Sequence, residues 1–211
     1  MVILRETGLT LSSQPSINTP EGILPELRAA TRGRHDRIER LLGFDSAMPL
    51  PRYGAILLGF QRFLAAWEAE LHEALPARLH GWLAGRGRQA FVAEDLAFLG
   101  ASVPAQPLRR VPRCLPQRSV PAAFGSLYVI EGSALGGQVI APRLERELGL
   151  APGRGASYFH GYGESTGAMW REFRLRAAAE IGDDPVHRRQ ACRAAEQTFD
   201  ALIASFGALP S

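Results

Sequence analysis

The chain has 211 residues, of which 46 % are hydrophobic and 21 % charged, a composition typical of a folded globular protein and not of a disordered one. This length is enough to bury a full hydrophobic core in a single domain. No run approaches the roughly 18 apolar residues of a membrane span, and the first nine residues are too weakly apolar for a signal peptide. The formal net charge is only +3. We therefore expect neither a membrane nor a nucleic acid as partner.

Two cysteines, Cys114 and Cys192, are too few and too far apart in sequence for a disulfide framework. This usage favours a reducing compartment, so we expect a cytoplasmic protein. All 24 basic residues are arginines. A coding bias is the simplest explanation, but it means that any anion bound by this chain is held by planar guanidinium groups.

Residues 1–20 show no hydrophobic periodicity and are predicted to form a flexible tail before one helical domain over residues 21–211. Helices are predicted from apolar periodicity and from proline, glycine and serine at their ends. Their expected ranges are about 23–43, 51–75, 76–84, 87–99, 119–148 (ending or kinking at Pro142), 164–181 and 185–206. Residues 101–118, with four prolines, are predicted to form a loop. No alternation of β-branched residues predicts a strand, so the expected fold class is all-α.

Four polar residues of the first predicted helix share one narrow stripe: Arg28, Arg32, His35 and Glu39 lie within about 60° of one another at 100° per residue. Glu39 could accept a hydrogen bond from one ring nitrogen of His35, leaving the other for a metal. The two arginines lie one and two turns earlier, where they could hold carboxylates. The alternative is a solvated helix face with an ion pair between His35 and Glu39. Spacing alone does not decide between them.

Several glycines interrupt the fifth predicted helix, where each costs roughly 0.5–1 kcal/mol relative to alanine. Gly125, Gly132 and Gly136 share one stripe, Gly137 follows directly, and Ser133 flanks the stripe. Such a stripe lets a flat molecule approach the backbone, with Ser133 holding a water. Two alternatives remain: a close helix crossing through Gly132 and Gly136, or a helix end at Gly136–Gly137. Glu131 points about 120° away from the stripe, so we expect a structural or surface role for it.

Three segments together resemble the haem oxygenase family. They are LRAATRGRHDRIE at 27–39, YVIEGSALGGQ at 128–138 and GYGESTGAMWREFR at 161–174. Their order and the helix lengths agree with the family over about residues 23–206, and the branch they resemble most is the bacterial one associated with bacteriophytochromes. The resemblance implies a single-domain, multi-helix fold in which haem lies between a proximal and a kinked distal helix.

The resemblance also implies roles for individual residues. His35 stands where the family has the only protein ligand to the haem iron, and Glu39 where it has the hydrogen-bond partner of that ring. Gly132, Gly136 and Gly137 stand where the distal helix makes room for haem and O₂. Ser133 stands where many animal members have an aspartate that organises distal water. The candidates for binding the haem propionates are Arg28, Arg32, Arg174 and, more weakly, Tyr128.

The implied activity is oxidative opening of haem b to biliverdin, CO and ferrous iron. Haem is both cofactor and substrate, O₂ is consumed, and electrons come from a reductase, a ferredoxin-type protein or a small molecule. Gly132, Ser133 and Gly136 are then the distal residues expected to take part in catalysis. The branch resemblance further implies a bacteriophytochrome that receives the biliverdin.

Two other classes of function compete with this interpretation. A non-catalytic haem-binding or haem-transfer protein of the same fold would use the same histidine. A di-iron carboxylate oxidase or a thiaminase-like hydrolase is disfavoured because no Glu-x-x-His pair is present. The two cysteines also lie in a proline-rich loop and in a helix rich in arginine and alanine, which are poor settings for a nucleophile.

Overall fold

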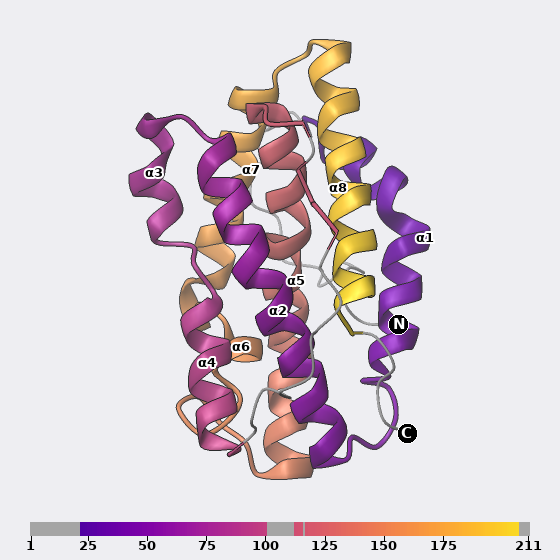
Figure 1. The fold of residues 1–211 in the computed structure, drawn as a ribbon, viewed down its shortest axis with the longest axis vertical. Helices are drawn as coiled ribbons and strands as arrows, with labels where there is room; N and C mark the ends of the chain where they lie inside the picture. Colours follow the sequence, from indigo (N-terminus) through magenta and orange to yellow (C-terminus); the bar gives the residue numbers. More distant parts are fainter. Residues whose placement is uncertain (1–21, 101–111, 116, 207–211) are drawn as a thin grey trace, which may run out of the picture.

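The computed structural model describes residues 22–100, 112–115 and 117–206 (Figure 1). Within these ranges it is all-α, apart from two isolated β-bridges at Ala151. The predicted tail over residues 1–20 and most of the predicted loop over 101–118 lie outside the described residues. The helices are α1 (Leu24–Leu42), α2 (Leu50–Ala74), α3 (Ala77–Ala84), α4 (Gln89–Phe98), α5 (Val120–Leu148), α6 (Ser157–His160), the 3₁₀ turn η1 (Gly163–Ser165), α7 (Thr166–Ile181) and α8 (Pro185–Phe206).

Most helix ends lie where the sequence predicts them. Gly43 ends α1 in the left-handed conformation, at φ 66°. Ser119 Oγ accepts a hydrogen bond from the backbone N–H of Ala122 at 3.3 Å and so caps α5. The Asp184 carboxylate likewise accepts from the N–H of Val186 at 2.7 Å before α8.

The long helix α5 covers the expected range of about 119–148, but it passes through both signals at which it could have stopped. It does not end at Gly136–Gly137 or at Pro142, and it continues to Leu148, where Gly149 closes it at φ 67°. The alternative that placed a helix end at the two glycines is therefore wrong. Two short elements, α6 and η1, were not predicted.

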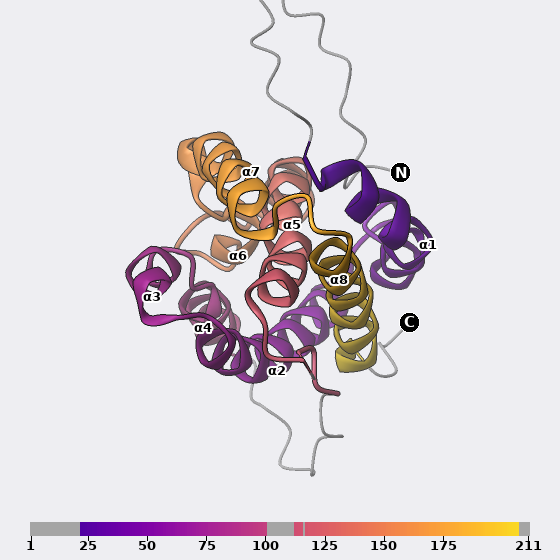
Figure 2. The ribbon, with the colours of Figure 1, turned by 90° about the horizontal axis from the view of Figure 1, so that it is seen from above.

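Helix α5 lies in the middle of the bundle, with α2, α7 and α8 around it (Figure 2). Every residue from Pro121 to Gly132 is buried. A buried polar cluster joins three of these helices: Trp67 Nε1 of α2 donates to Ser126 Oγ at 2.8 Å, and that hydroxyl bonds Thr198 Oγ1 of α8 at 2.6 Å. Because an unmade buried hydrogen bond is costly, this cluster fixes the register of α2, α5 and α8.

Two of the costly glycines of α5 make room for other parts of the chain. A Cβ atom at Gly125 would lie 1.9 Å from the carbonyl oxygen of Ala191 in α8. One at Gly137 would lie 2.2 Å from the carbonyl oxygen of Phe159 in α6. Close helix crossing therefore explains Gly125, which the sequence grouped with Gly132 and Gly136 on one stripe.

Helix α1 is attached to the bundle through α8, and α1, α5 and α8 begin at the same end of the molecule (Figure 1). Arg34 lies 2.8 Å from Glu196 and 3.0 Å from Asp200, both on α8. These ion pairs explain why an arginine falls on the otherwise apolar side of α1. Among the helices that the structure describes, none is both long and apolar enough to cross a membrane.

The close crossing of α5 and α8 predicts a large cost for Gly125→Ala. The added methyl group would collide with the backbone of Ala191, which has no flexible end to move away, so we expect a loss of about 3 kcal/mol or more in unfolding free energy. The matched control is Gly54→Ala in α2, a buried glycine at which an added Cβ meets no atom within 4 Å. This control should be neutral or stabilise by about 0.5–1 kcal/mol. Urea unfolding of both variants measures the difference, and equal stability of the two would contradict the close contact.

Candidate functional site

The imidazole of His35 is the most unusual side chain of α1. Only 12 % of it is exposed, and Phe199 of α8 packs edge-on against the ring with centroids 6.1 Å apart. Its Nδ1 lies 3.8 Å from an Oε2 oxygen of Glu39, one turn further along the helix. Its Nε2 is buried and has no hydrogen-bond partner. A buried imidazole nitrogen without a hydrogen-bond partner is suited to bind a metal ion, because burying such an atom without any partner is costly.

The protonation state of His35 fits the same role. Burial lowers the pKa of His35 below its ordinary value, and the nearby carboxylates of Glu39 and Asp36 oppose the shift only in part. The neutral ring, which is the form that binds metals, is therefore favoured at neutral pH. His35, Asp36 and Glu39 also form the one cluster in the described ranges whose ligand atoms approach closely enough to hold a metal ion.

The cationic side chains proposed for an anion lie on two helices. Arg28 and Arg32 are exposed on α1, two turns and one turn before His35, and Arg174 is half-buried on α7. Arg32 and Arg174 form no ion pair with any described residue. Arg28, Arg32, His35 and Glu39 thus share one side of α1, and the guanidinium groups of Arg32 on α1 and Arg174 on α7 are available for an anion.

Tyr128 of α5 connects α5 to α1. Burial raises the pKa of Tyr128, while the charge of Arg28 and hydrogen bonds with Thr31 and Arg28 oppose the shift. The phenol therefore meets α1 at the turn that precedes His35. Gly132 lies one turn after Tyr128 on α5, and His35 lies one turn after Thr31 on α1. Since both helices begin at the same end of the molecule, they run in the same direction from this contact, α5 toward Gly132 and α1 toward His35 (Figure 1).

The distal candidates of α5 lie in surroundings of different kinds. Gly132 and Gly136 are buried, and Ser133 is half-buried. The Ser133 hydroxyl donates to the carbonyl of Ile130 at 2.7 Å. Gly137 is held against α6, so the space left by its missing side chain is already used by Phe159.

Behind this part of α5 lie two buried arginines that sequence reasoning missed. Arg86 pairs with Glu131 at 2.6 Å and with Glu172 at 2.8 Å. Arg88 contacts Ser133 and Ile130 of α5. Glu131 is therefore a structural residue, which is one of the two roles expected from the sequence. It is buried and does not lie at the surface. The partners of these charges are distant in sequence, so no local pattern indicated them.

The two cysteines are unsuited to nucleophilic catalysis. Burial raises the pKa of Cys114 to about 12 and that of Cys192 to about 11. Both thiols stay protonated at neutral pH, whereas reactive cysteines carry a thiolate. The alternative of a cysteine-dependent hydrolase loses support.

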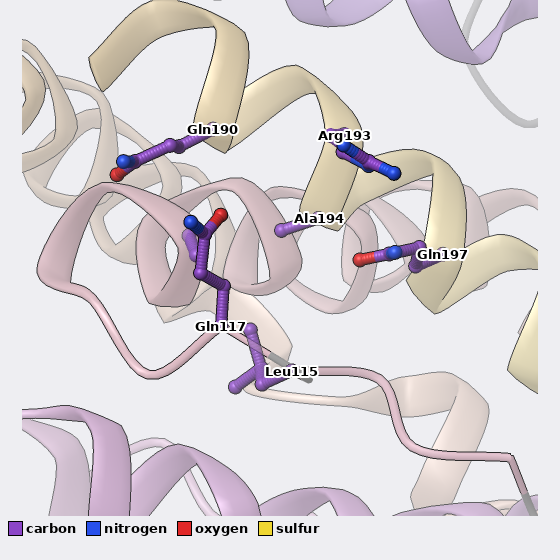
Figure 3. Close-up of a pocket in the computed structure, with 7 residues that line it drawn as sticks. Leu115, Gln117, Gln190, Arg193, Ala194 and Gln197 are labelled. Atoms are coloured by element: carbon purple, nitrogen blue, oxygen red, sulfur yellow. The ribbon is translucent and has the colours of Figure 1, made fainter. Parts of the chain in front are cut away.

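A cavity of about 250 Å³ opens between the start of α5 and α8 (Figure 3). Gln190, Arg193 and Gln197 of α8 line it, together with Leu115 and Ala122. At 100° per residue these α8 positions lie on the side of the helix opposite Phe199, which packs on His35. This cavity is therefore separate from the candidate site.

Comparison with known proteins agrees with the helical arrangement and with the three motifs. Residues 22–208 match the family model described as Heme oxygenase. This chain belongs to the haem oxygenase family. A curated relative named heme oxygenase, from Xanthomonas campestris pv. campestris (strain 8004), is 37 % identical over 138 residues, which are 62 % of this chain and 78 % of the relative. The chain is accordingly an enzyme, a haem oxygenase, and haem degradation is its general activity.

Solved haem oxygenases share the fold. The NO- and CO-bound enzyme from Neisseria meningitidis is 25 % identical with a TM-score of 0.67, over 88 % of this chain and 92 % of that one. The enzyme from Leptospira interrogans, at 18 % identity, gives 0.68 over 88 % and 98 %. Heme oxygenase 2 from Chlamydomonas reinhardtii, without heme, is also 18 % identical and gives 0.69 over 90 % and 98 %. The all-α fold class predicted from the sequence is confirmed.

The buried pair of Arg86 and Glu131 behind the distal helix predicts a pH-dependent loss of stability for Arg86→Met. Removing the guanidinium leaves a buried carboxylate without its partner, which costs about 3–5 kcal/mol. Burial already raises the pKa of Glu131, with Arg86 opposing it, so without Arg86 the pKa rises further. The folded state then binds more protons than the unfolded state, and stability falls as pH rises.

Urea unfolding at pH 5 and pH 8 measures this effect. The Arg86→Met loss should be larger at pH 8, and the double variant Arg86→Met/Glu131→Leu should recover most of it. Arg78→Met is the control, because its ion pair with Glu180 lies at the surface and should contribute less than about 1 kcal/mol. A loss that does not change with pH would show that the Glu131 charge is not the cause.

Proposed function

We propose that this haem oxygenase opens haem to biliverdin, CO and ferrous iron, with His35 as the only protein ligand to the iron. When bound, haem supplies the iron that activates O₂ and the ring carbon that is attacked. The residues of this chain fit such a ligand, and the observation that carries the proposal is the buried Nε2 atom of His35 without a partner.

On the proximal side, His35 would bind the iron through Nε2 as a neutral imidazole. The Glu39 carboxylate, 3.8 Å from Nδ1, would accept a hydrogen bond from the N–H at that nitrogen when the ring turns slightly. This second contact sets the tautomer and raises the basicity of the ligand. Phe199 supports the ring from α8 and limits its rotation.

At the edge of the haem, we propose that Arg28, Arg32 and Arg174 bind the propionates. Arg32 and Arg174 have no described carboxylate to pair with, and a guanidinium binds a carboxylate through two parallel hydrogen bonds. Tyr128 would support Arg28 in this role, since its hydroxyl already meets that residue.

On the distal side, Gly132 and Gly136 would let the α5 backbone approach the haem, and Ser133 would hold water. A larger side chain at either glycine would occupy the space for O₂. Gly137 would contribute indirectly, because its contact with Phe159 holds α5 against α6. The chain offers no distal histidine in this stretch, so its work there is to shape the space and place water.

We further propose O₂ and an external electron donor as cosubstrates, the donor being a reductase, a ferredoxin-type protein or a small molecule. The resemblance of the three motifs to the bacteriophytochrome-associated branch supports biliverdin delivery to such a photoreceptor. The two free thiols support a cytoplasmic reaction.

Hemin titration of the wild type and of His35→Ala tests the proposal. The wild type should form a one-to-one complex with a Soret band, and His35→Ala should lose the ligand spectrum because no other described imidazole adjoins the site. Free imidazole should restore it. The exposed His72→Ala is the matched control and should leave the spectrum unchanged. Ascorbate in air should then replace the wild-type Soret band by a biliverdin band. A stable Soret band would indicate a haem carrier instead.

The propionate assignment predicts weaker haem binding in the double variant Arg32→Ala/Arg174→Ala. Two charge-assisted hydrogen-bonding partners are lost at partly exposed positions, so we expect affinity to fall about tenfold. Arg37→Ala/Arg40→Ala is the matched control, because it also removes two exposed arginine charges, from the other side of α1. Competition for hemin against apomyoglobin measures the affinities. Equal losses for the double variant and the control would refute specific propionate contacts.

A further inference from the structure

Arg88, which immediately precedes α4, has a fully buried side chain, 1 % exposed, that reaches across to the distal helix. Its Nη1 lies 3.5 Å from the carbonyl oxygen of Ile130 and 3.4 Å from Ser133 Oγ. Its Nη2 donates to the carbonyl of Tyr158 in α6. The guanidinium also lies 4.4 Å from the ring centroid of Tyr158. It therefore bridges α6 and the turn of α5 that carries Gly132 and Ser133.

This guanidinium forms no salt bridge with a carboxylate of the described residues, although its charge opposes the raised pKa of Glu131. Its Nε is buried without a hydrogen bond. Arg86, two residues earlier, pairs with Glu131 and Glu172. Glu68 is used at the start of α4, where its Oε1 accepts from the backbone N–H groups of Arg88 and Gln89 at 2.8 and 3.2 Å.

An arginine cannot lose its proton, so burial of Arg88 keeps a full positive charge inside the protein. A buried cation held mainly by carbonyl oxygens and an aromatic ring is expensive. Apolar packing could fill the same volume without that cost. The arrangement therefore indicates a use for the charge itself at this point behind α5.

The hydrogen bonds of Ser133 show how the charge of Arg88 can act on groups at the distal face. A hydroxyl has one proton to donate and two lone pairs. Ser133 donates to Ile130 at 2.7 Å and receives a long hydrogen bond from Arg88. The buried Tyr158 hydroxyl, which has no other partner, also faces Ser133, so toward this phenol or a water Ser133 acts only as an acceptor. A water that donates one proton to Ser133 keeps its second proton to donate toward an anion in the ligand space.

We propose that Arg88 is a positioning and specificity residue that favours anionic over neutral ligands at the distal face of the haem. It does so by its permanent charge and by fixing Ser133 as a hydrogen-bond acceptor. The inference rests on the proposed function, because it needs haem bound between His35 and α5. Arg88 touches α5 and α6 and is not assigned a contact with the haem.

The test compares an anion and a neutral ligand on the haem complex. Azide is titrated onto the ferric complex and carbon monoxide onto the ferrous one, for the wild type, Arg88→Met and Arg88→Lys. Loss of one buried unit charge should weaken azide binding about tenfold and leave carbon monoxide affinity within about twofold. Arg88→Lys should recover most of the azide affinity. The C–O stretching band should move to higher wavenumber in Arg88→Met.

The controls separate electrostatics from packing. Arg78→Met removes an exposed arginine and should leave both affinities unchanged. If Arg88→Met does not fold, Arg88→Gln takes its place, because an amide keeps donors for the Tyr158 and Ile130 carbonyls without the charge. Unchanged azide affinity in a folded neutral variant, or equal losses for azide and carbon monoxide, would overturn the proposal. Failure of the wild type to bind hemin would instead overturn the proposed function, and this inference with it.

Discussion

The separation between α1 and α5 is set by α8, and the candidate site depends on this separation. At Gly125 the backbones of α5 and α8 touch without an intervening side chain. On its other side α8 holds α1 through the ion pairs of Arg34 with Glu196 and Asp200. The buried bond between Ser126 and Thr198 fixes how far one helix slides along the other. The proximal and distal residues therefore owe their relative positions largely to these contacts of α8, beside the direct contact of Tyr128 with Arg28 and Thr31.

The helix bounds could be predicted because their signals are local. Gly43, Ser119 and Asp184 each satisfy backbone groups within a few residues of themselves, so their residue types suffice to mark an end. Pro142 and the pair Gly136–Gly137 show the limit of such signals. The tertiary packing around α5 outweighs their local cost, and the helix runs on to Leu148. α6 and η1 are too short to show a periodicity.

The structural roles of individual residues were harder to predict, because these roles depend on contact partners far along the chain. Helix angles could predict the stripe of glycines, but not which residue packs against each glycine. Ala191 packs against Gly125, and Phe159 packs against Gly137. Arg34 lies on the otherwise apolar side of α1, and its partners are the carboxylates of α8, far along the chain. Glu131 could be assigned a structural role by its direction, whereas its buried pairing with Arg86 needed the structure. His35 was accessible to sequence reasoning because its motif, and not its surroundings, carried the signal.

The two arginines behind α5 show why arginine, and not lysine, suits this bundle. Arg86 uses its planar fork to join Glu131 of α5 and Glu172 of α7, and Arg88 spreads its donors over oxygens of α5 and α6. A lysine ammonium presents one compact charge and could not span both helices in either place. Arg88 also affects the electrostatics of the candidate site. A carboxylate, Glu39, lies beside the imidazole on α1, and a guanidinium that forms no salt bridge lies behind Ser133 on α5. Charges of opposite sign thus lie behind the two surfaces proposed to hold the haem. The negative charge of Glu39 raises the basicity of the proximal ligand. The positive charge of Arg88 attracts anions to the distal face.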